Sequence, residues 1–137
     1  MTNEEKQLLL RDLCCRMPYE VKISVQSWDE EEQEYIDRVD TMYSINGDEY
    51  IKSANEDYDF SIEDIKPYLF PLSSRTEEQS KELEEIDPEF YSLICSDGEI
   101  YISMDLRGYD WLNKNHFDYR GLIPKGLAID ATGKNIY

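Results

Sequence analysis

Four residues near the C-terminal end of the chain have side-chain types and spacing that could serve a small catalytic site. His116 is the only histidine, Asp118 follows two positions later, and Tyr119 and Arg120 come next. An imidazole that is oriented by a carboxylate or a phenol is a common general base, so one hypothesis is an enzyme that uses these residues. However, residues two positions apart do not share a helix face. The spacing therefore favours the structural alternative, a half-buried histidine at the C-terminal end of a helix.

Arg120 also has two interpretations. Its guanidinium offers a planar fork of donors to a phosphate or a carboxylate ligand. In a chain with 31 acidic residues, pairing with a nearby acid is the more common arrangement. Gly121 and Gly126 do not have the spacing of a phosphate-binding loop, which places its glycines between a strand and a helix. The sequence therefore predicts no such loop here.

The acidic residues do not form a recognisable metal site. Asp57 and Asp59, or Glu63 and Asp64, could bind a divalent cation, but this segment lacks the glycine that an EF-hand loop requires. A solvated loop is the expected structure. We expect no metal and no other cofactor.

The three cysteines do not indicate a disulfide framework. Cys14 and Cys15 are neighbours in a predicted helix, and Cys95 lies in a predicted strand. The sequence predicts reduced, mostly buried thiols, and the spacing is not that of a zinc site.

Negative charge is the most unusual property of the chain. The net charge is -17; residues 1–106 carry 28 acids and 9 bases (-19), whereas residues 107–137 carry 3 acids and 5 bases (+2). An acidic surface repels nucleic acids and anionic membranes, so we expect direct binding to neither. It attracts a basic protein partner, although acidity also serves simply to keep a small protein soluble. The predicted partner-binding residues are Asp29, Glu30, Glu31, Glu32, Glu34, Glu77, Glu78, Glu82 and Glu85.

Aromatic residues offer a second kind of contact. Trp28, Tyr35 and Tyr43 could form a contact surface, because tryptophan and tyrosine are common in protein interfaces. Packing in the core is the alternative for each of them.

The chain should begin with a helix. Thr2 starts a T-x-x-E capping box, and the apolar residues after it recur at helical spacing, which predicts a helix to about Arg16. Alternating apolar and polar residues then predict a strand over 19–27. Five acids in the eight residues 28–35 predict a solvated connection.

The next segment predicts an antiparallel meander. A second strand fits residues 36–45, the pair Asn46-Gly47 is a hairpin signal, and residues 49–53 can return as a third strand.

Two helices are expected in the middle of the chain. Ser61 can cap a short helix over 62–69, which Pro71 would end. Thr76 starts a T-x-x-Q capping box for a second, acidic helix over 77–86, whose few apolar anchors predict a surface position.

The last part predicts a hairpin and a helix. Strands over 90–95 and 99–104 should pair, and a helix should follow over 105–117. Gly121 is placed to end the structure in a left-handed cap, and residues 123–126 (IPKG) suit a tight turn.

These elements predict an α+β fold in a single domain over residues 1–137, an antiparallel sheet of four to five strands in two hairpins, packed with three to four helices. No stretch approaches the roughly 20 apolar residues of a membrane helix, and the first residues do not resemble a secretory signal, so we expect a cytoplasmic protein. It should be a monomer, or a weak homo-oligomer that assembles through an exposed strand edge.

Two segments resemble a group of short uncharacterised proteins from gut bacteria and their mobile elements or phages. They are LNKNHFDYRGLIPKGLAIDA, residues 112–131, and IKPYLFPLSSRTEEQ, residues 65–79. Pro124 departs from the pattern, which has an acidic or polar residue there. The resemblance implies a bacterial or phage setting, and it implies no catalytic residue because the group has no known activity.

The leading functional hypothesis is a non-catalytic intracellular domain that binds or regulates a protein, with acids in 29–40 and 76–89 contacting a basic partner. A sharper form is an inhibitor from a phage or mobile element that imitates the charge of nucleic acid. The other class is the small enzyme that uses His116, Asp118, Tyr119 and Arg120.

Overall fold

The structure is a computed structural model, and it describes residues 1–47, 50–88 and 106–137. Within these ranges there are three α-helices and three short 3-10 turns: α1 (Asn3–Arg16), α2 (Glu77–Ile86), α4 (Leu106–Lys114), η1 (Met17–Tyr19), η2 (Ile62–Asp64) and η3 (Leu72–Ser74). The strands are β1 (Lys22–Asp29), β2 (Glu34–Asn46), β3 (Tyr50–Ser53), β4 (Asp59–Ser61), β5 (Lys66–Pro71), β6 (Phe117–Asp118) and β7 (Ile129–Asp130). The expected hairpin over 90–104 lies outside the described residues.

The predicted α+β class is confirmed, but the sheet is larger than expected and is mixed. Seven strands form one open sheet in the order β4-β3-β2-β1-β5-β6, and β7 also pairs with β5. The contacts of β5 with β6 and with β7 are parallel, so the expectation of a purely antiparallel sheet is wrong. The two parallel additions, β6 and β7, have two residues each, and β4, which was also not expected, has three; strands this short do not show an alternating pattern in the sequence.

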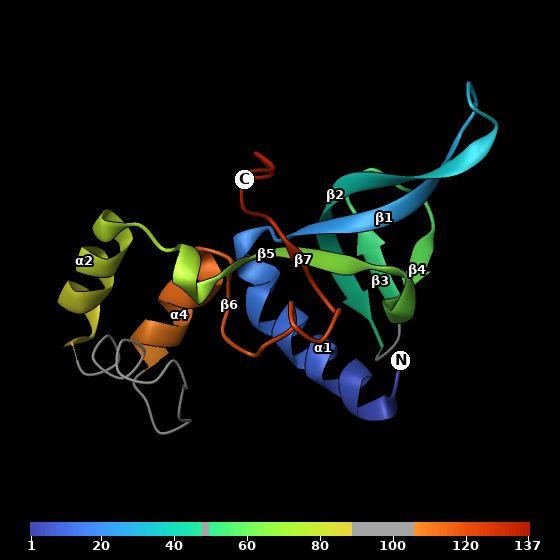
Figure 1. Ribbon diagram of the computed structural model, residues 1–137. Helices are drawn as coiled ribbons and strands as arrows, with labels where there is room; N and C mark the ends of the chain where they lie inside the picture. The colour runs from blue at the N-terminus through green and yellow to red at the C-terminus, as the bar shows by residue number, and fades with distance from the viewer. Residues whose placement is uncertain (48–49, 89–105) are drawn as a thin grey trace.

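The first helix is confirmed in its bounds and its N-cap, although only the Thr2 half of the predicted capping box is seen. The Thr2 side chain accepts a hydrogen bond from the backbone N–H of Glu5, and α1 ends at Arg16. Leu9 and Leu13 are fully buried and pack in the main hydrophobic core against β1 and β5 residues. This core lies between α1 and the sheet (Figure 1).

The strand predicted at 19–27 is β1, shifted by two to three residues, and its alternation is confirmed. Ile23 and Val25 are buried, whereas Gln26, the next residue along β1, is exposed. The solvated connection expected over 28–35 is wrong at both ends, because Trp28 pairs with Tyr35 in the ladder of β1 with β2. Only four residues turn between the two strands.

The turn is held by one of its own acids. The Asp29 carboxylate accepts hydrogen bonds from the backbone N–H groups of Glu31 and Glu32 and from the Arg38 guanidinium, at 2.9, 3.1 and 3.1 Å. This local capping lets the strands continue through an acid-rich sequence. We call β1 residues 26–29, the turn and β2 residues 34–39 the hairpin arm; its tip projects beyond the rest of the sheet (Figure 1).

The meander of β2 and β3 is confirmed. The two strands pair antiparallel, with an irregularity between Met42 and Ser44. Gly47 in the turn has a φ of 67°, a conformation that glycine adopts without strain.

The helix predicted over 62–69 is wrong. Ser61 caps only the short turn η2, accepting a hydrogen bond from the N–H of Glu63 at 3.4 Å, and the chain then enters β5 beside β1. Pro67 provides the physical reason. A proline inside a helix removes a hydrogen bond, and it pushes the residue before it, Lys66, toward an extended backbone.

The acidic helix α2 is confirmed together with its capping box. The Thr76 side chain accepts from the N–H of Gln79, and the Gln79 side chain accepts from the N–H of Thr76. Leu83 is buried in a second, smaller core with Trp111 and Phe117. Figure 1 shows α2 and α4 at one end of the molecule, with the hairpin arm at the other.

The helix expected over 105–117 is shorter at its C-terminal end than predicted. α4 ends at Lys114, and Phe117 already belongs to β6. The tight turn at 123–126 is confirmed, since the N–H of Gly126 donates to the carbonyl of Ile123 at 3.0 Å.

Candidate functional site

His116 closes α4 with its own backbone. Its φ is 61°, and its N–H donates to the carbonyl of Asn113 at 3.2 Å. This left-handed residue follows Asn115, the first residue after α4, so His116 rather than Gly121 provides the cap. Gly121 also has a positive φ, 73°, but it lies beyond β6. The His116 carbonyl accepts the N–H of Phe70 at 2.8 Å, which fixes β5 beside the helix end.

The imidazole of His116 packs against an aromatic ring. It stacks on Tyr137 with ring centroids 3.7 Å apart, and its Nδ1 is buried without a hydrogen-bond partner. Burial is the main cause that lowers the pKa of His116 to about 4, and the positive charges of Arg16 and Lys22 contribute to the same shift. The ring is therefore neutral at pH 7.

The carboxylate of Asp118 is used by the backbone. It accepts hydrogen bonds from the N–H groups of Arg120, Leu122 and Ile123 at 3.3, 3.0 and 2.9 Å. These bonds hold the chain where it turns after β6. The carboxylate is thus directed at the following loop, and none of its hydrogen bonds involves His116.

Tyr119 and Arg120 join a charged cluster with two residues of α1 that the sequence reasoning missed. Asp12 and Arg16 are both fully buried, and the guanidinium of Arg16 donates to the Asp12 carboxylate through Nε at 2.7 Å and Nη2 at 3.1 Å. The same Nη2 lies 2.6 Å from the carbonyl of Phe117. Arg120 Nε lies 3.4 Å from Asp12, so the expectation that Arg120 pairs with an acid is met by a residue 108 positions away in the sequence.

Tyr119 is packed between these charges and the small core. The guanidinium carbons of Arg16 and Arg120 lie 5.4 and 5.1 Å from the centre of its ring. Its hydroxyl donates to Asn113 Oδ1 at 2.9 Å, and burial raises its pKa. The cluster holds α1 against the end of α4, and this structural role is sufficient to explain its contacts.

The four sequence-predicted catalytic residues therefore divide into three settings: His116 stacks on Tyr137, Asp118 holds a loop, and Tyr119 with Arg120 packs on α1. General acid–base work requires the base and its orienting group within hydrogen-bond reach. Among the described residues, His116 has no such partner on Nδ1. The geometry supports the enzyme hypothesis less than the structural one.

The expectation of mostly buried thiols is wrong for the two described cysteines. Cys14 and Cys15 are free and exposed, and Cys15 Sγ lies 3.6 Å from Arg120 Nη2. Leu13 lies on the buried face of α1, which is turned toward the sheet. Cys14 and Cys15 are the next two residues of the helix, so their side chains point outward. Cys95 lies outside the described residues.

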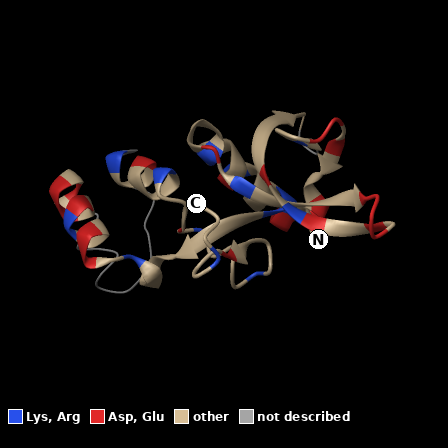
Figure 2. Cartoon of the chain, turned by 90° about the horizontal axis from the view of Figure 1, so that it is seen from above, with Lys and Arg blue, Asp and Glu red and all other residues tan. Residues whose placement is uncertain are grey.

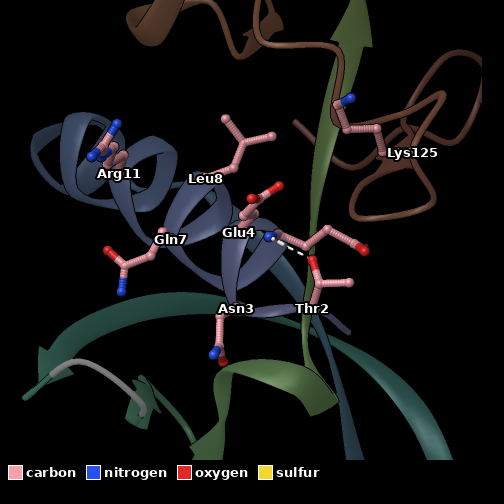
Figure 3. A pocket seen from close by; sticks show the side chains of 8 residues that line it. Thr2, Asn3, Glu4, Gln7, Leu8, Arg11 and Lys125 are labelled. Atoms are coloured by element: carbon pink, nitrogen blue, oxygen red, sulfur yellow. Dashed lines mark hydrogen bonds between the residues drawn. The ribbon is translucent and has the colours of Figure 1, made fainter.

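A shallow depression of about 670 Å³ lies at the N-terminal end of α1 (Figure 3). Its lining includes Glu4, Glu5, Arg11 and Lys125, whose formal charges cancel. Thr2, which also lines it, is occupied in capping the helix (Figure 3). None of the sequence-predicted site residues lines this depression.

Trp28 and Tyr35 of the hairpin arm, and Tyr43 farther along β2, lie on the surface, so the core alternative is wrong for all three. Trp28, Tyr35 and Tyr43 are 51%, 66% and 66% exposed. Trp28 and Tyr35 are directly paired across the strands, and their rings meet edge to face with centroids 5.2 Å apart. Val39 on the same face of β2 is 46% exposed. Exposed, pre-packed aromatic side chains of this kind suit a protein contact.

The two groups of predicted partner-binding acids are far apart. Asp29, Glu30, Glu31, Glu32 and Glu34 lie at the tip of the hairpin arm, whereas Glu77, Glu78, Glu82 and Glu85 lie on α2. Figure 2 shows these two red regions at opposite ends of the molecule. One of the α2 acids is already engaged, because Glu82 accepts a hydrogen bond from the indole N–H of Trp111 at 3.1 Å.

Within the described ranges, no group of three or more potential metal ligands comes together. The described helices include none that is long and apolar enough to cross a membrane. The fold and its contacts thus define the class, a small α+β domain with an acidic, aromatic hairpin arm. No known protein family, curated protein or solved structure matches the chain.

Proposed function

We propose that this protein is a non-catalytic intracellular domain that binds a basic protein partner, and that the hairpin arm is its contact surface. The observation that carries the proposal is the exposed Trp28–Tyr35 pair beside the acidic turn. Two large aromatic side chains kept in contact with each other, and away from the core, are a surface ready for a partner.

The hairpin arm has better support than α2 as the contact. Hot spots of protein interfaces combine aromatic anchors with charged neighbours, and the arm has both. Among the described residues, the large apolar side chains with high exposure include Trp28, Tyr35 and Val39 on the arm and none on α2. The acids of α2 lie at the other end of the molecule, so they would contribute at a distance to steering rather than to the contact.

The decisive test compares two charge-reversal variants with the same net change. Glu30→Lys with Glu31→Lys alters the arm, and Glu78→Lys with Glu85→Lys alters α2; all four side chains are exposed. Partners are captured from the native cell at low and at high salt, and each variant is first shown to have the unfolding midpoint of the unmodified protein. We expect the arm variant to lose a partner that the α2 variant retains, with capture weakening as salt rises.

Trp28→Ala with Tyr35→Ala tests the aromatic part of the proposal without any change of charge. Its capture should fall by at least about tenfold, because an interface anchor contributes about 2 kcal/mol or more. Capture of the same partners by the arm variants and by the unmodified protein would refute the proposed function.

A further inference from the structure

The outer edge of the hairpin arm carries backbone groups that the register leaves without partners. The N–H of Met42 donates to the carbonyl of Val21, and Lys22 then pairs with Thr41. In an antiparallel ladder, hydrogen-bonded and non-hydrogen-bonded pairs alternate. Residues 36 and 38 of β2 therefore bond to β1, while residues 35, 37 and 39 turn their N–H and C=O groups away from it.

The next strand does not reach this part of β2. β3 begins its pairing at Met42, and its continuation ends with the N–H of Ala54 donating to the carbonyl of Thr41 at 2.9 Å. Within the part of the chain that the structure describes, the backbone groups of Tyr35, Asp37 and Val39 bond neither to β1 nor to another segment. The edge from residue 35 to residue 39 is thus open, and all three residues are exposed.

The opposite edge, along β1, is occupied up to the base of the arm and at Gln26. Ser24 pairs with Lys66 of β5, and the Tyr58 hydroxyl donates to the carbonyl of Gln26 at 3.2 Å. The edge of β2 is therefore the longer site at which another strand can add.

Charge decides which occupant suits this edge. Residues 29–38 hold six acids and one base, a net charge of -5. A second copy of the chain would bring its own -5 beside it, and a charged residue in the middle of an edge strand, here Asp37, is a common device against self-pairing. A basic strand has the opposite energetics, because lysine or arginine placed across from Asp37 forms a favourable cross-strand pair.

We propose that the open edge of β2 at residues 35–39 binds an extended, basic segment of the partner by strand addition, an inference that rests on the function proposed above. Main-chain hydrogen bonds give such a contact its affinity, and alternate side chains give its specificity. Tyr35, Asp37 and Val39 share one face of β2, so the segment should present apolar, basic and apolar residues at alternate positions.

A synthetic peptide tests this directly. The probe is Lys-Thr-Val-Thr-Lys-Thr-Val-Thr-Lys, acetylated and amidated, and it is compared with two N-methylated forms of equal charge. One carries methyl groups on the backbone nitrogens of the valines and the central lysine, the other on three threonines. Because N–H groups alternate in direction along a strand, only one methylated form blocks the side that faces β2.

We expect the peptide whose methyl groups face β2 to bind at least about tenfold more weakly than the unmodified peptide. The peptide whose methyl groups face away from β2 should bind within about twofold of the unmodified peptide. The unmodified peptide should also slow the exchange of the amide protons of Tyr35, Asp37 and Val39, while those of Ile36 and Arg38, already bonded to β1, serve as internal controls. Asp37→Lys, a change at an exposed position, should weaken binding by about tenfold.

Equal affinities of the two methylated peptides, or no binding of the unmodified peptide at low salt, would overturn strand addition. The two proposals fail separately. If the arm variants lose their cellular partner but the peptide does not bind, the contact surface stands and strand addition is wrong. If the arm variants keep their partner, the proposed function itself is wrong.

Discussion

The stacked imidazole of His116 predicts a specific dependence of stability on pH. The pKa of a histidine in an unfolded chain is about 6.5, and burial lowers that of His116 to about 4 in the folded state. Between these two values the unfolded state binds more protons than the folded one. Stability from this residue is therefore fully present above about pH 6.5 and is lost progressively as the pH falls toward 4.

The size of the effect follows from the same two values. At pH 5 the unfolded histidine is almost fully protonated and the folded one is mostly neutral, so His116 should lower the free energy of unfolding by about 2 kcal/mol relative to pH 8. The 31 acids of the chain also titrate toward low pH, and their contribution must be removed. The matched control is His116→Phe, which keeps an aromatic ring over Tyr137 and cannot be protonated.

Urea unfolding of both proteins from pH 5 to pH 8 isolates the imidazole, since the acids contribute equally and cancel in the difference. From pH 8 to pH 5 the free energy of unfolding of the unmodified protein should fall by about 2 kcal/mol more than that of His116→Phe. As His116 is the only histidine, its ring resonance in an NMR titration gives the folded pKa directly. If the stability curves of the two proteins run parallel from pH 5 to pH 8, or if the pKa of His116 in the folded protein is near 6.5, the imidazole is not buried against Tyr137 as described.

Two further predictions concern the contributions of two carboxylates, Asp12 and Asp118, to the free energy of unfolding. Asp12→Asn should lower the free energy of unfolding by about 3–5 kcal/mol in urea titrations, because it leaves the buried Arg16 without its counter-charge; a loss below 1 kcal/mol would contradict this burial. Asp118→Ala removes the acceptor of three backbone N–H groups and should cost about 2–3 kcal/mol, whereas the control Asp130→Ala, on an exposed side chain, should cost under about 1 kcal/mol. Equal losses from these two alanine variants would mean that Asp118 does not hold the loop.

Elements with a strong local signal were predictable from the sequence. The capping residues Thr2 and Thr76 each precede a helix that begins where expected, and Asn46-Gly47 marks the turn between β2 and β3. In each case a few adjacent residues satisfy the backbone groups that the element leaves open. At β5 two local signals conflict: Ser61 is a helix-capping residue, but Pro67 lies inside the segment and favours an extended backbone before it.

The charged cluster and the parallel strands could not be predicted in the same way. Asp12 and Arg16 show only the i, i+4 spacing of an ordinary surface pair, and their burial depends on Tyr119 and Arg120, more than 100 residues later. β6 joins β5 through two residues, Phe117 and Asp118. Such contacts are set by tertiary packing, which a local pattern does not record.

The hairpin arm is an intermediate case, in which an irregular pattern had a physical meaning. Along β2, Tyr35, Asp37 and Val39 face one side and Ile36 and Arg38 the other, so apolar and charged residues occur on both faces. A strand that covers a core keeps its buried face apolar. The mixed pattern therefore follows from a ribbon that extends past the core, in which Ser27 is buried but Tyr35, Asp37 and Val39 are exposed. Side chains there contribute little to folding, so the loss of Trp28 and Tyr35 should affect partner binding far more than stability.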